Sequence, residues 1–477
     1  MRRVTLAGLA LTVAACADPT ITIAPAYDGP IDDPDAVPTG LDRLTLAVAA
    51  AGSDQDIAAV SFAPGAQIEL TGVPLDEALV VHLTGLVGGG GVAYGRTCAF
   101  TVTADGAALE PHLWFARNVK FGTLAVTPSA RRGGVAITTH DGQAVIVGAD
   151  ALAAAAAVER FEPRTAELDN VATVRARTGA LAAPLGQGAA ERIVVIGGAV
   201  AGAAVPTVES ITLDPAARVE RLADEPQLAR VAATATPLTD GRLVVIGGRG
   251  AGDTLVATVT ELALRGGGVE IRAAPARLAH PRADHTATRL GDDVGAPVLI
   301  VGGADAAGPV AIAELWKPLS GELADPARFA PRMVVPRRGH VARLLPDGSV
   351  LVIGGVDAAG QPVRALERYA LDTGFELVGE LPVGVGVVDL TATTLPDGRV
   401  LLVGGRATPG GPAVDTAVIA RLDVIGGTID VVATDRLAQP RAGHQAALVC
   451  DGTVLVTGGG DGPTAPERYN PPATGRR

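Results

Sequence analysis

Seven times after residue 134 the sequence runs an apolar, β-branched stretch into glycine, and the pattern begins again about fifty residues later. A β-branched run that ends at a glycine pair predicts a strand followed by a backbone turn that only glycine tolerates. Repetition at this period predicts a fold assembled from repeated supersecondary units. The glycine positions are Gly148 (followed by Ala149), Gly197-Gly198, Gly247-Gly248, Gly302-Gly303, Gly354-Gly355, Gly404-Gly405 and Gly458-Gly459.

The repeats agree in more than their glycines. Residues 336–355 (PRRGHVARLLPDGSVLVIGG) and 440–459 (PRAGHQAALVCDGTVLVTGG) match position for position. Each predicts an apolar strand, a two-residue Asp-Gly hairpin turn and a second, β-branched strand. A third strand follows a variable, Gly-rich loop and begins with a glutamate in every repeat except the sixth, which has Val418. These glutamates are Glu159, Glu209, Glu261, Glu314, Glu367 and Glu467.

With these elements the chain resembles the kelch repeat family, whose blades carry the glycine pair after the second strand and a Glu with an aromatic residue in the third. The resemblance covers residues 119–477 and implies an all-β fold, with a seven-bladed kelch-like β-propeller over residues 111–477. The edge of the last blade needs protection. In residues 119–126 every second residue, beginning with Val119 and Phe121, falls on one face of an extended chain. This segment predicts a strand that pairs with the C-terminal end of the chain and closes the ring.

The N-terminal part has a different organisation. Residues 1–15 predict a signal peptide, and Val13-Ala14-Ala15-Cys16 looks like a bacterial lipobox, so we expect a lipid on Cys16 and delivery to the outer membrane of a bacterial envelope. An ordinary cleaved signal with an incidental cysteine is the alternative. Residues 16–40 are rich in Asp and Pro and predict a disordered acidic tether. Residues 41–110 alternate in hydropathy and predict a small β-sandwich-like domain.

The net charge and the aromatic content argue against two kinds of binding function. A net charge of -12 argues against nucleic-acid binding, and 3% aromatic residues argue against an exposed stacking platform.

In an exported protein Cys98 and Cys450 could form a disulfide. We expect two unlinked thiols instead, because Cys98 alternates with core-facing Phe100 and Val102 while Cys450 precedes a turn in another domain.

One row of arginines occupies equivalent places just before the first strand of a repeat. In a kelch-like propeller these places border the mouth of the central channel, so the guanidinium groups could bind carboxylates of a ligand. The alternative, which we favour, is that each arginine pairs with a repeated glutamate such as Glu314 or Glu367, since buried carboxylates require partners. The row consists of Arg131, Arg230, Arg282, Arg337 and Arg441.

Three histidines, His285, His340 and His444, each follow an arginine of this row by three residues. Imidazoles that approach one another can bind a metal ion. We favour a structural role in which each ring bonds to the backbone of its own repeat, because no nearby spacing supplies a further ligand. The other four repeats place Gly134, Gly179, Ala233 and Leu390 at this position.

No nucleophile elbow, zinc-protease helix or phosphate-binding glycine loop occurs in the sequence. We therefore predict a membrane-anchored lipoprotein without catalysis or cofactor, whose propeller binds an envelope protein or an extracellular ligand. One alternative is a copper-radical enzyme of the galactose oxidase kind, although none of the tyrosines has a cysteine placed to form the required Tyr-Cys cross-link. The other alternative is a purely structural envelope protein.

Overall fold

The structure is a computed structural model that describes residues 9–14, 20–26, 40–53, 55–64, 66, 68–71, 74–103, 111–124, 126, 134–148, 155–214, 216–222, 224–460, 462 and 464–471. Within these ranges the regular structure is β-strand, apart from three single-turn 3-10 helices. The predicted all-β class is confirmed. The three short helices are η1 (Gly188–Ala190), η2 (Pro226–Leu228) and η3 (Ala251–Asp253).

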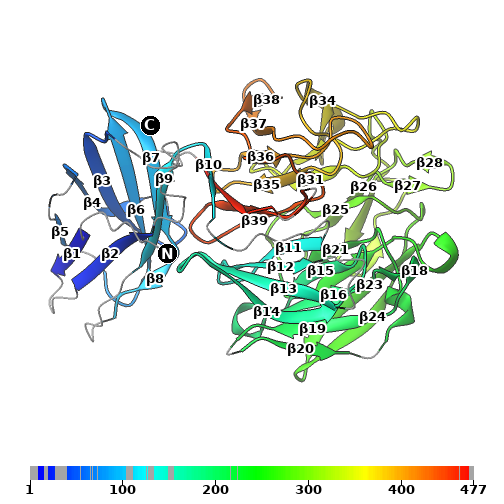
Figure 1. Ribbon diagram of the computed structural model, residues 1–477. Coiled ribbons are helices and arrows are strands. Elements are labelled where there is room, and N and C mark those ends of the chain that lie inside the picture. Colours follow the sequence, from blue (N-terminus) through cyan, green and yellow to red (C-terminus); the bar gives the residue numbers. More distant parts are fainter. Residues whose placement is uncertain are drawn as a thin grey trace.

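The N-terminal strands form one nine-stranded sheet, drawn blue to cyan in Figure 1. Its order is β4-β3-β6-β7-β9-β2-β1-β5, with β8 paired to β6, so the two-sheet sandwich is not confirmed. β9 extends the sheet past residue 110, and β1 and β2 fall in the ranges predicted as signal peptide and tether. The bounds are β1 (Leu9–Ala14), β2 (Thr20–Ala26), β3 (Arg43–Ala50), β4 (Asp56–Phe62), β5 (Ile68–Thr71), β6 (Ala78–Val87), β7 (Gly90–Thr97), β8 (Phe100–Thr101) and β9 (His112–Arg117).

The repeats form seven four-stranded antiparallel sheets, together called the seven-sheet unit below. The first is β11 (Gly134–Thr138), β12 (Ala144–Gly148), β13 (Ala155–Glu162) and β14 (Glu167–Arg175), and the second is β15 (Leu181–Leu185), β16 (Arg192–Ile196), β19 (Val208–Thr212) and β20 (Arg218–Arg221). The third is β21 (Thr234–Pro237), β22 (Leu243–Ile246), β23 (Thr258–Arg265) and β24 (Gly268–Arg277), and the fourth is β25 (Thr286–Arg289), β26 (Val298–Val301), β29 (Glu314–Lys317) and β30 (Glu322–Leu323).

The fifth sheet is β31 (Val341–Leu344), β32 (Val350–Ile353), β33 (Ala365–Ala370) and β34 (Gly374–Glu380), and the sixth is β35 (Thr391–Thr394), β36 (Val400–Val403), β37 (Ala417–Asp423) and β38 (Thr428–Ala433). The seventh sheet combines both ends of the unit, because β10 (Lys120–Thr123) joins β39 (Gln445–Leu448), β40 (Val454–Thr457) and β41 (Glu467–Asn470). Two hairpins, β17 (Ala199–Val200) with β18 (Ala203–Ala204) and β27 (Ala304–Asp305) with β28 (Gly308–Pro309), extend from the loops.

The first strands of the sheets lie side by side in the order β11, β15, β21, β25, β31, β35 and β39, and β39 in turn contacts β11. Figure 1 shows the sheets following one another from cyan to red. The predicted pairing of residues 119–126 with the end of the chain is confirmed, because β10 runs antiparallel to β41 with Phe121 opposite Tyr469. The core lies between neighbouring sheets, where the fully buried second strands pack.

The glycine pairs lie where one sheet approaches the next. Gly247 and Gly248 both have positive φ, 63° and 98°. A Cβ on Gly247 would come within 2.7 Å of the carbonyl oxygen of Arg282 and of the His285 ring, both from the following repeat. Gly302 meets Arg337 and His340 in the same way. Glycine is therefore required by the contact between sheets as well as by backbone conformation.

The Asp-Gly hairpins have three loop residues, so the two-residue turn predicted from the sequence is wrong. In the third repeat Gly241 N donates to Leu238 O, and Leu238 N donates to Arg242 O, which leaves residues 239–241 in the loop. Only the glycine has positive φ, at 80°, as expected for a type I turn followed by a bulge. The Asp240 carboxylate accepts from Arg242 N at 3.1 Å, so the aspartate fastens the loop from within.

A disulfide joins Cys98 to Cys450 across 352 residues, so the expectation of two unlinked thiols is wrong. The alternation of residues in the sequence correctly places Cys98 on the buried side of its segment. That buried side, however, faces the last repeat, which carries Cys450. The Asn470 amide donates to the carbonyls of Tyr94 and Ala116, each at 2.9 Å. The Arg468 guanidinium lies 4.6 Å from the centre of the Trp114 ring. The N-terminal sheet is thus fastened to the seventh sheet.

Candidate functional site

Three arginines of the row lie inside the sheets, each paired with a repeated glutamate. Arg282 binds Glu314 at 2.7 Å, Arg337 binds Glu367 at 2.5 Å and Arg441 binds Glu467 at 2.6 Å. The three guanidinium-bearing side chains are at most 1% exposed. Each also donates to the carbonyl of the first glycine of its own repeat, as Arg337 does to Gly354. These donors leave no exposed guanidinium surface for a ligand.

Each pair fixes the chain where it passes from one sheet to the next. The Glu314 carboxylate accepts from the backbone N–H of Ala279 and His280, in the segment that leads into β25. The carbonyl of Arg282 accepts from Gly248 N of the preceding repeat at 2.9 Å. One arginine therefore holds its own sheet through its side chain and the preceding sheet through its backbone, as the structural alternative predicts. Arg131 lies outside the described residues.

The second repeat has the same pair, which the sequence alignment missed. Arg177 binds Glu209 at 2.7 Å and is 1% exposed. The residue that packs on the second glycine of this repeat is Ala180, not Gly179, so the predicted alignment was shifted by one position. The sequence did contain a spacing that identifies this arginine, because Arg177 precedes Ala180 by the same three residues that separate arginine and histidine in other repeats.

The third repeat lacks the carboxylate partner. Thr260, opposite Val245, occupies the place of the glutamate, and Glu261 points to the other face of the sheet because side chains alternate. Glu261 binds Arg242 at 2.5 Å. Arg230 instead donates to the hydroxyls of Thr258 and Thr260, each at 3.1 Å. Burial without a carboxylate lowers the pKa of Arg230 to about 10.

The three histidines join neighbouring first strands rather than bonding to the backbone of their own repeats. The Nε2 atoms of His285, His340 and His444 lie 3.3, 2.9 and 2.7 Å from threonine hydroxyls of the preceding repeat. Burial, with a nearby arginine as a smaller cause, lowers each pKa to about 3, so the rings are neutral at pH 7. The described part of the chain holds no cluster of three or more His, Cys, Asp or Glu that could bind a metal. The threonine partners are Thr234, Thr286 and Thr391.

A different set of arginines is available at the edge where the chain enters each first strand and leaves each glycine pair. We call this edge the loop face. Short β-bridges form it, pairing Arg249 with Val231, Arg338 with Val356 and Arg406 with Val388. Arg338 is exposed, and its side chain has no hydrogen-bond or ion-pair partner among the described residues. The other two have looser carboxylate contacts, 3.4 Å from Arg249 to Asp253 and 3.5 Å from Arg406 to Asp389. Arg406 also donates a hydrogen bond to the carbonyl of Gly411.

The loop face also differs between repeats. The second and fourth repeats carry the hairpins β17–β18 and β27–β28, and the third carries η3. Asp305 and Asp357 accept from backbone N–H groups two residues later, at 2.7 and 2.9 Å, as turn residues do. The loops that the repeats place on the loop face therefore differ from one another in length and charge, although the sheets share one architecture.

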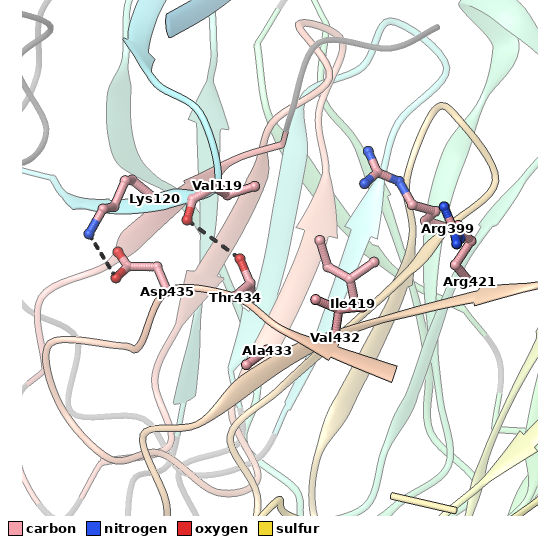
Figure 2. Close-up of a pocket in the computed structure, with 9 residues that line it drawn as sticks. All are labelled: Val119, Lys120, Arg399, Ile419, Arg421, Val432, Ala433, Thr434 and Asp435. Atoms are coloured by element: carbon pink, nitrogen blue, oxygen red, sulfur yellow. Dashed lines mark hydrogen bonds and ion pairs between the residues drawn. The ribbon is translucent and has the colours of Figure 1, made fainter. Parts of the chain in front are cut away.

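A cavity of about 510 Å³ lies at the seam between the sixth sheet and β10, and Figure 2 shows its lining. Its three cations are already paired: Lys120 with Asp435 at 3.2 Å, Arg421 with Asp430 at 3.1 Å, and Arg399 with Asp397. The Thr434 hydroxyl donates to Val119 O across the seam. These contacts fasten β10 to the sixth sheet, so we assign this cavity to the closure of the seven-sheet unit.

Two further observations bear on the predicted anchor and on the enzyme alternative. None of the helices in the described ranges is long and apolar enough to cross a membrane. Cys16 lies outside those ranges. Burial raises the pKa of both Tyr369 and Tyr469 to about 12, and both side chains belong to the hydrophobic core between sheets.

Comparison with known proteins assigns no family to the chain. No family model matches the chain, and no curated protein matches it. Among solved structures, that of YjhT aligns over 61% of this chain and 94% of its own length, with a TM-score of 0.46 and 15% sequence identity. Any functional proposal for this protein therefore depends on its own residues.

Proposed function

We propose that this chain is a membrane-anchored binding scaffold built on a kelch-like, seven-bladed β-propeller. Seven four-stranded sheets with first strands in circular order, and a last sheet completed by β10, support the propeller. The glycine pairs and the Arg–Glu pairs fall where kelch blades would pack on one another. In this proposal the loop face is the mouth of the propeller.

The observation that carries the binding role is the contrast between the two arginine sets. Arg282, Arg337 and Arg441 are buried in ion pairs with glutamates, whereas Arg338 on the loop face is exposed and its side chain has no partner in the part of the chain that the structure describes. Arg249 and Arg406 border the same face with weakly held carboxylates. Guanidinium groups on a shared face suit a partner that presents carboxylates, because they bind them bidentately.

The anchoring part of the proposal rests on Cys16 and on the disulfide. A lipid on Cys16 would hold the propeller at a membrane of the bacterial envelope, outer membrane in our proposal. The bond between Cys98 and Cys450 suits export, because disulfides persist in oxidising compartments and are rare in the cytosol.

A capture experiment tests the binding role. Immobilised protein would be incubated with an envelope extract of the source cells, comparing wild type with the triple variant Arg249→Ala, Arg338→Ala, Arg406→Ala. A matched control replaces Arg218, Arg272 and Arg328, which are exposed elsewhere on the unit, by alanine. We expect the loop-face variant to lose a partner that wild type and control both retain, at an unchanged melting temperature. Equal capture by all three proteins would exclude these arginines from binding.

A further inference from the structure

The junction between the N-terminal sheet and the seventh sheet contains a cavity of about 520 Å³. Residues 138–142, of the first Asp-Gly hairpin, and residues 448–450 with Gly452, of the last one, form two of its walls, and Arg96 and Ala99 of the N-terminal part form another. The two hairpins touch, because Cys450 N donates to Gly142 O at 3.0 Å. The Cys98–Cys450 disulfide lies at this junction, and Cys450 lines the cavity.

The two sulfur atoms of this disulfide differ in accessibility. Cys98, in the N-terminal part, is 4% exposed. Cys450 is half-buried and sits on a hairpin loop at the cavity wall. A thiolate that enters the cavity therefore reaches the sulfur of Cys450 before that of Cys98. Which sulfur is attacked and how accessible it is determine the rate of thiol–disulfide exchange.

The cavity also holds a cation without a partner. The side chain of Arg96 makes no hydrogen bond or ion pair with the described residues, and its Nε is buried. By contrast Arg164, which also lines the cavity, binds Glu162 at 3.2 Å, and His140 lies 3.3 Å from Glu191. A free guanidinium beside a disulfide attracts an incoming thiolate and stabilises the thiolate that leaves.

We propose that Cys98–Cys450 is a reducible clasp, opened from the cavity by a dithiol reductant. One thiolate of the reductant attacks Cys450 Sγ and forms a mixed disulfide, and the electron pair of the broken S–S bond leaves on Cys98 Sγ as a thiolate. The second thiolate of the reductant attacks its own sulfur in the mixed disulfide, which releases Cys450 as a thiolate and leaves the reductant as a disulfide. The clasp is reduced by two electrons and the dithiol is oxidised by two.

Opening the clasp leaves the other connections of the junction in place. The β10–β41 pairing and the bonds of Asn470 to Tyr94 and Ala116 need no disulfide. We therefore expect the reduced protein to stay folded, with the N-terminal sheet held less tightly on the seventh sheet. The redox state of the surroundings would set how firmly the two parts are joined.

The experiment measures reduction of the native full-length protein by dithiothreitol at pH 8. Samples are quenched with acid and alkylated, and free thiols are counted by mass spectrometry while near-UV circular dichroism follows the fold. We expect both thiols to appear while the native dichroism persists. We expect Arg96→Ala to slow the reaction several-fold, Arg96→Lys to recover part of the rate, and Arg272→Ala, the same charge change far from the cavity, to leave it unchanged.

Trapping with glutathione, a monothiol, identifies the attacked sulfur, and we expect the adduct on Cys450. Thiols that appear only at the rate of global unfolding, or equal rates for wild type and Arg96→Ala, would overturn the proposal. If Arg96→Ala fails to fold, salt takes its place: 1 M NaCl should slow reduction of the wild type by screening the guanidinium, because the Debye length falls to about 3 Å. A rate that does not respond to salt would equally overturn the proposal.

Discussion

In the sixth repeat apolar residues replace both partners of the buried arginine–glutamate pair. Val387 occupies the place of the arginine, since its carbonyl accepts from Gly355 N as the carbonyl of Arg282 does from Gly248 N. Val418 occupies the place of the glutamate, and both valines belong to one hydrophobic cluster. A buried pair can be replaced by apolar residues at little cost, whereas losing one partner strands a buried charge.

This contrast predicts the stability of variants in the fifth repeat. Arg337→Val alone should cost about 3–5 kcal/mol, because it leaves the fully buried Glu367 carboxylate without its partner. The double variant Arg337→Val, Glu367→Val reproduces the sixth repeat and should recover most of that loss. Arg338→Ala, the exposed neighbour, is the control and should change stability by less than about 0.5 kcal/mol. Urea unfolding measures all three, and a double variant no more stable than Arg337→Val alone would contradict the coupling.

The histidines predict acid sensitivity. Their pKa is about 3 in the folded protein and 6.5 in an unfolded chain, so between these values the unfolded state binds more protons. Stability should therefore fall as pH drops below 6.5, by up to about 1.4 kcal/mol per pH unit for each histidine.

Leucine already stands at the histidine position in the sixth repeat, as Leu390, so His340→Leu is the conservative test. Unfolding free energies at pH 7, 6 and 5 should show a shallower slope for this variant, by about one proton's contribution at the lowest pH. An identical slope for wild type and variant would mean that His340 titrates normally in the folded protein.

At the scale of elements, β10 completes the seventh sheet. It pairs with β41, packs Phe121 against Tyr469 at 4.8 Å between ring centres, and donates from Phe121 N to the Asp435 carboxylate at 3.0 Å. Without β10, the backbone of β41 would be left as an open sheet edge, which invites aggregation.

Two truncations test this role of β10. A chain that begins at residue 111 keeps β9 and β10, and a chain that begins at residue 127 loses both. Both would carry Cys450→Ser, since each lacks Cys98. We expect the shorter chain to melt several degrees lower and to aggregate more readily, as followed by circular dichroism and light scattering. Equal melting temperatures would show that β10 does not stabilise the unit.

At the scale of the whole molecule, the connections between distant parts of the chain converge on the last repeat. The disulfide, the β10–β41 pairing and the Asn470 amide all tie the N-terminal region to residues 450–470. The N-terminal sheet is therefore part of how the repeats are held together, in addition to its place between the proposed anchor and the seven-sheet unit.

The proposed anchor gives a prediction for the whole protein in its cell. Cys16→Ser should move the protein from the membrane fraction to the soluble periplasmic fraction, because the lipid would be its means of membrane attachment. Labelled fatty acid should enter wild type and not the variant. A variant that still sediments with membranes, beside an unlabelled wild type, would rule out the lipoprotein.

The sequence by itself determined the repeat, its glycines and the all-β class, because strand period and glycine conformation are local properties of the chain. It also predicted the pairing of residues 119–126 with the chain end, since an unpaired edge needs cover. Alternation in one segment could not reveal the Cys98–Cys450 bond, because that bond depends on which surface a distant part of the chain presents.

The tertiary structure alone decided which arginines are free. Arg337 and Arg338 are neighbours in sequence, yet one is buried against Glu367 and the other is exposed. A shift of one residue reverses the facing of a side chain, which is why the alignment missed Arg177 and misplaced Glu261. Repetition fixed the positions where strands begin and end, whereas the packing of one sheet on the next decided which side chains remained for a ligand.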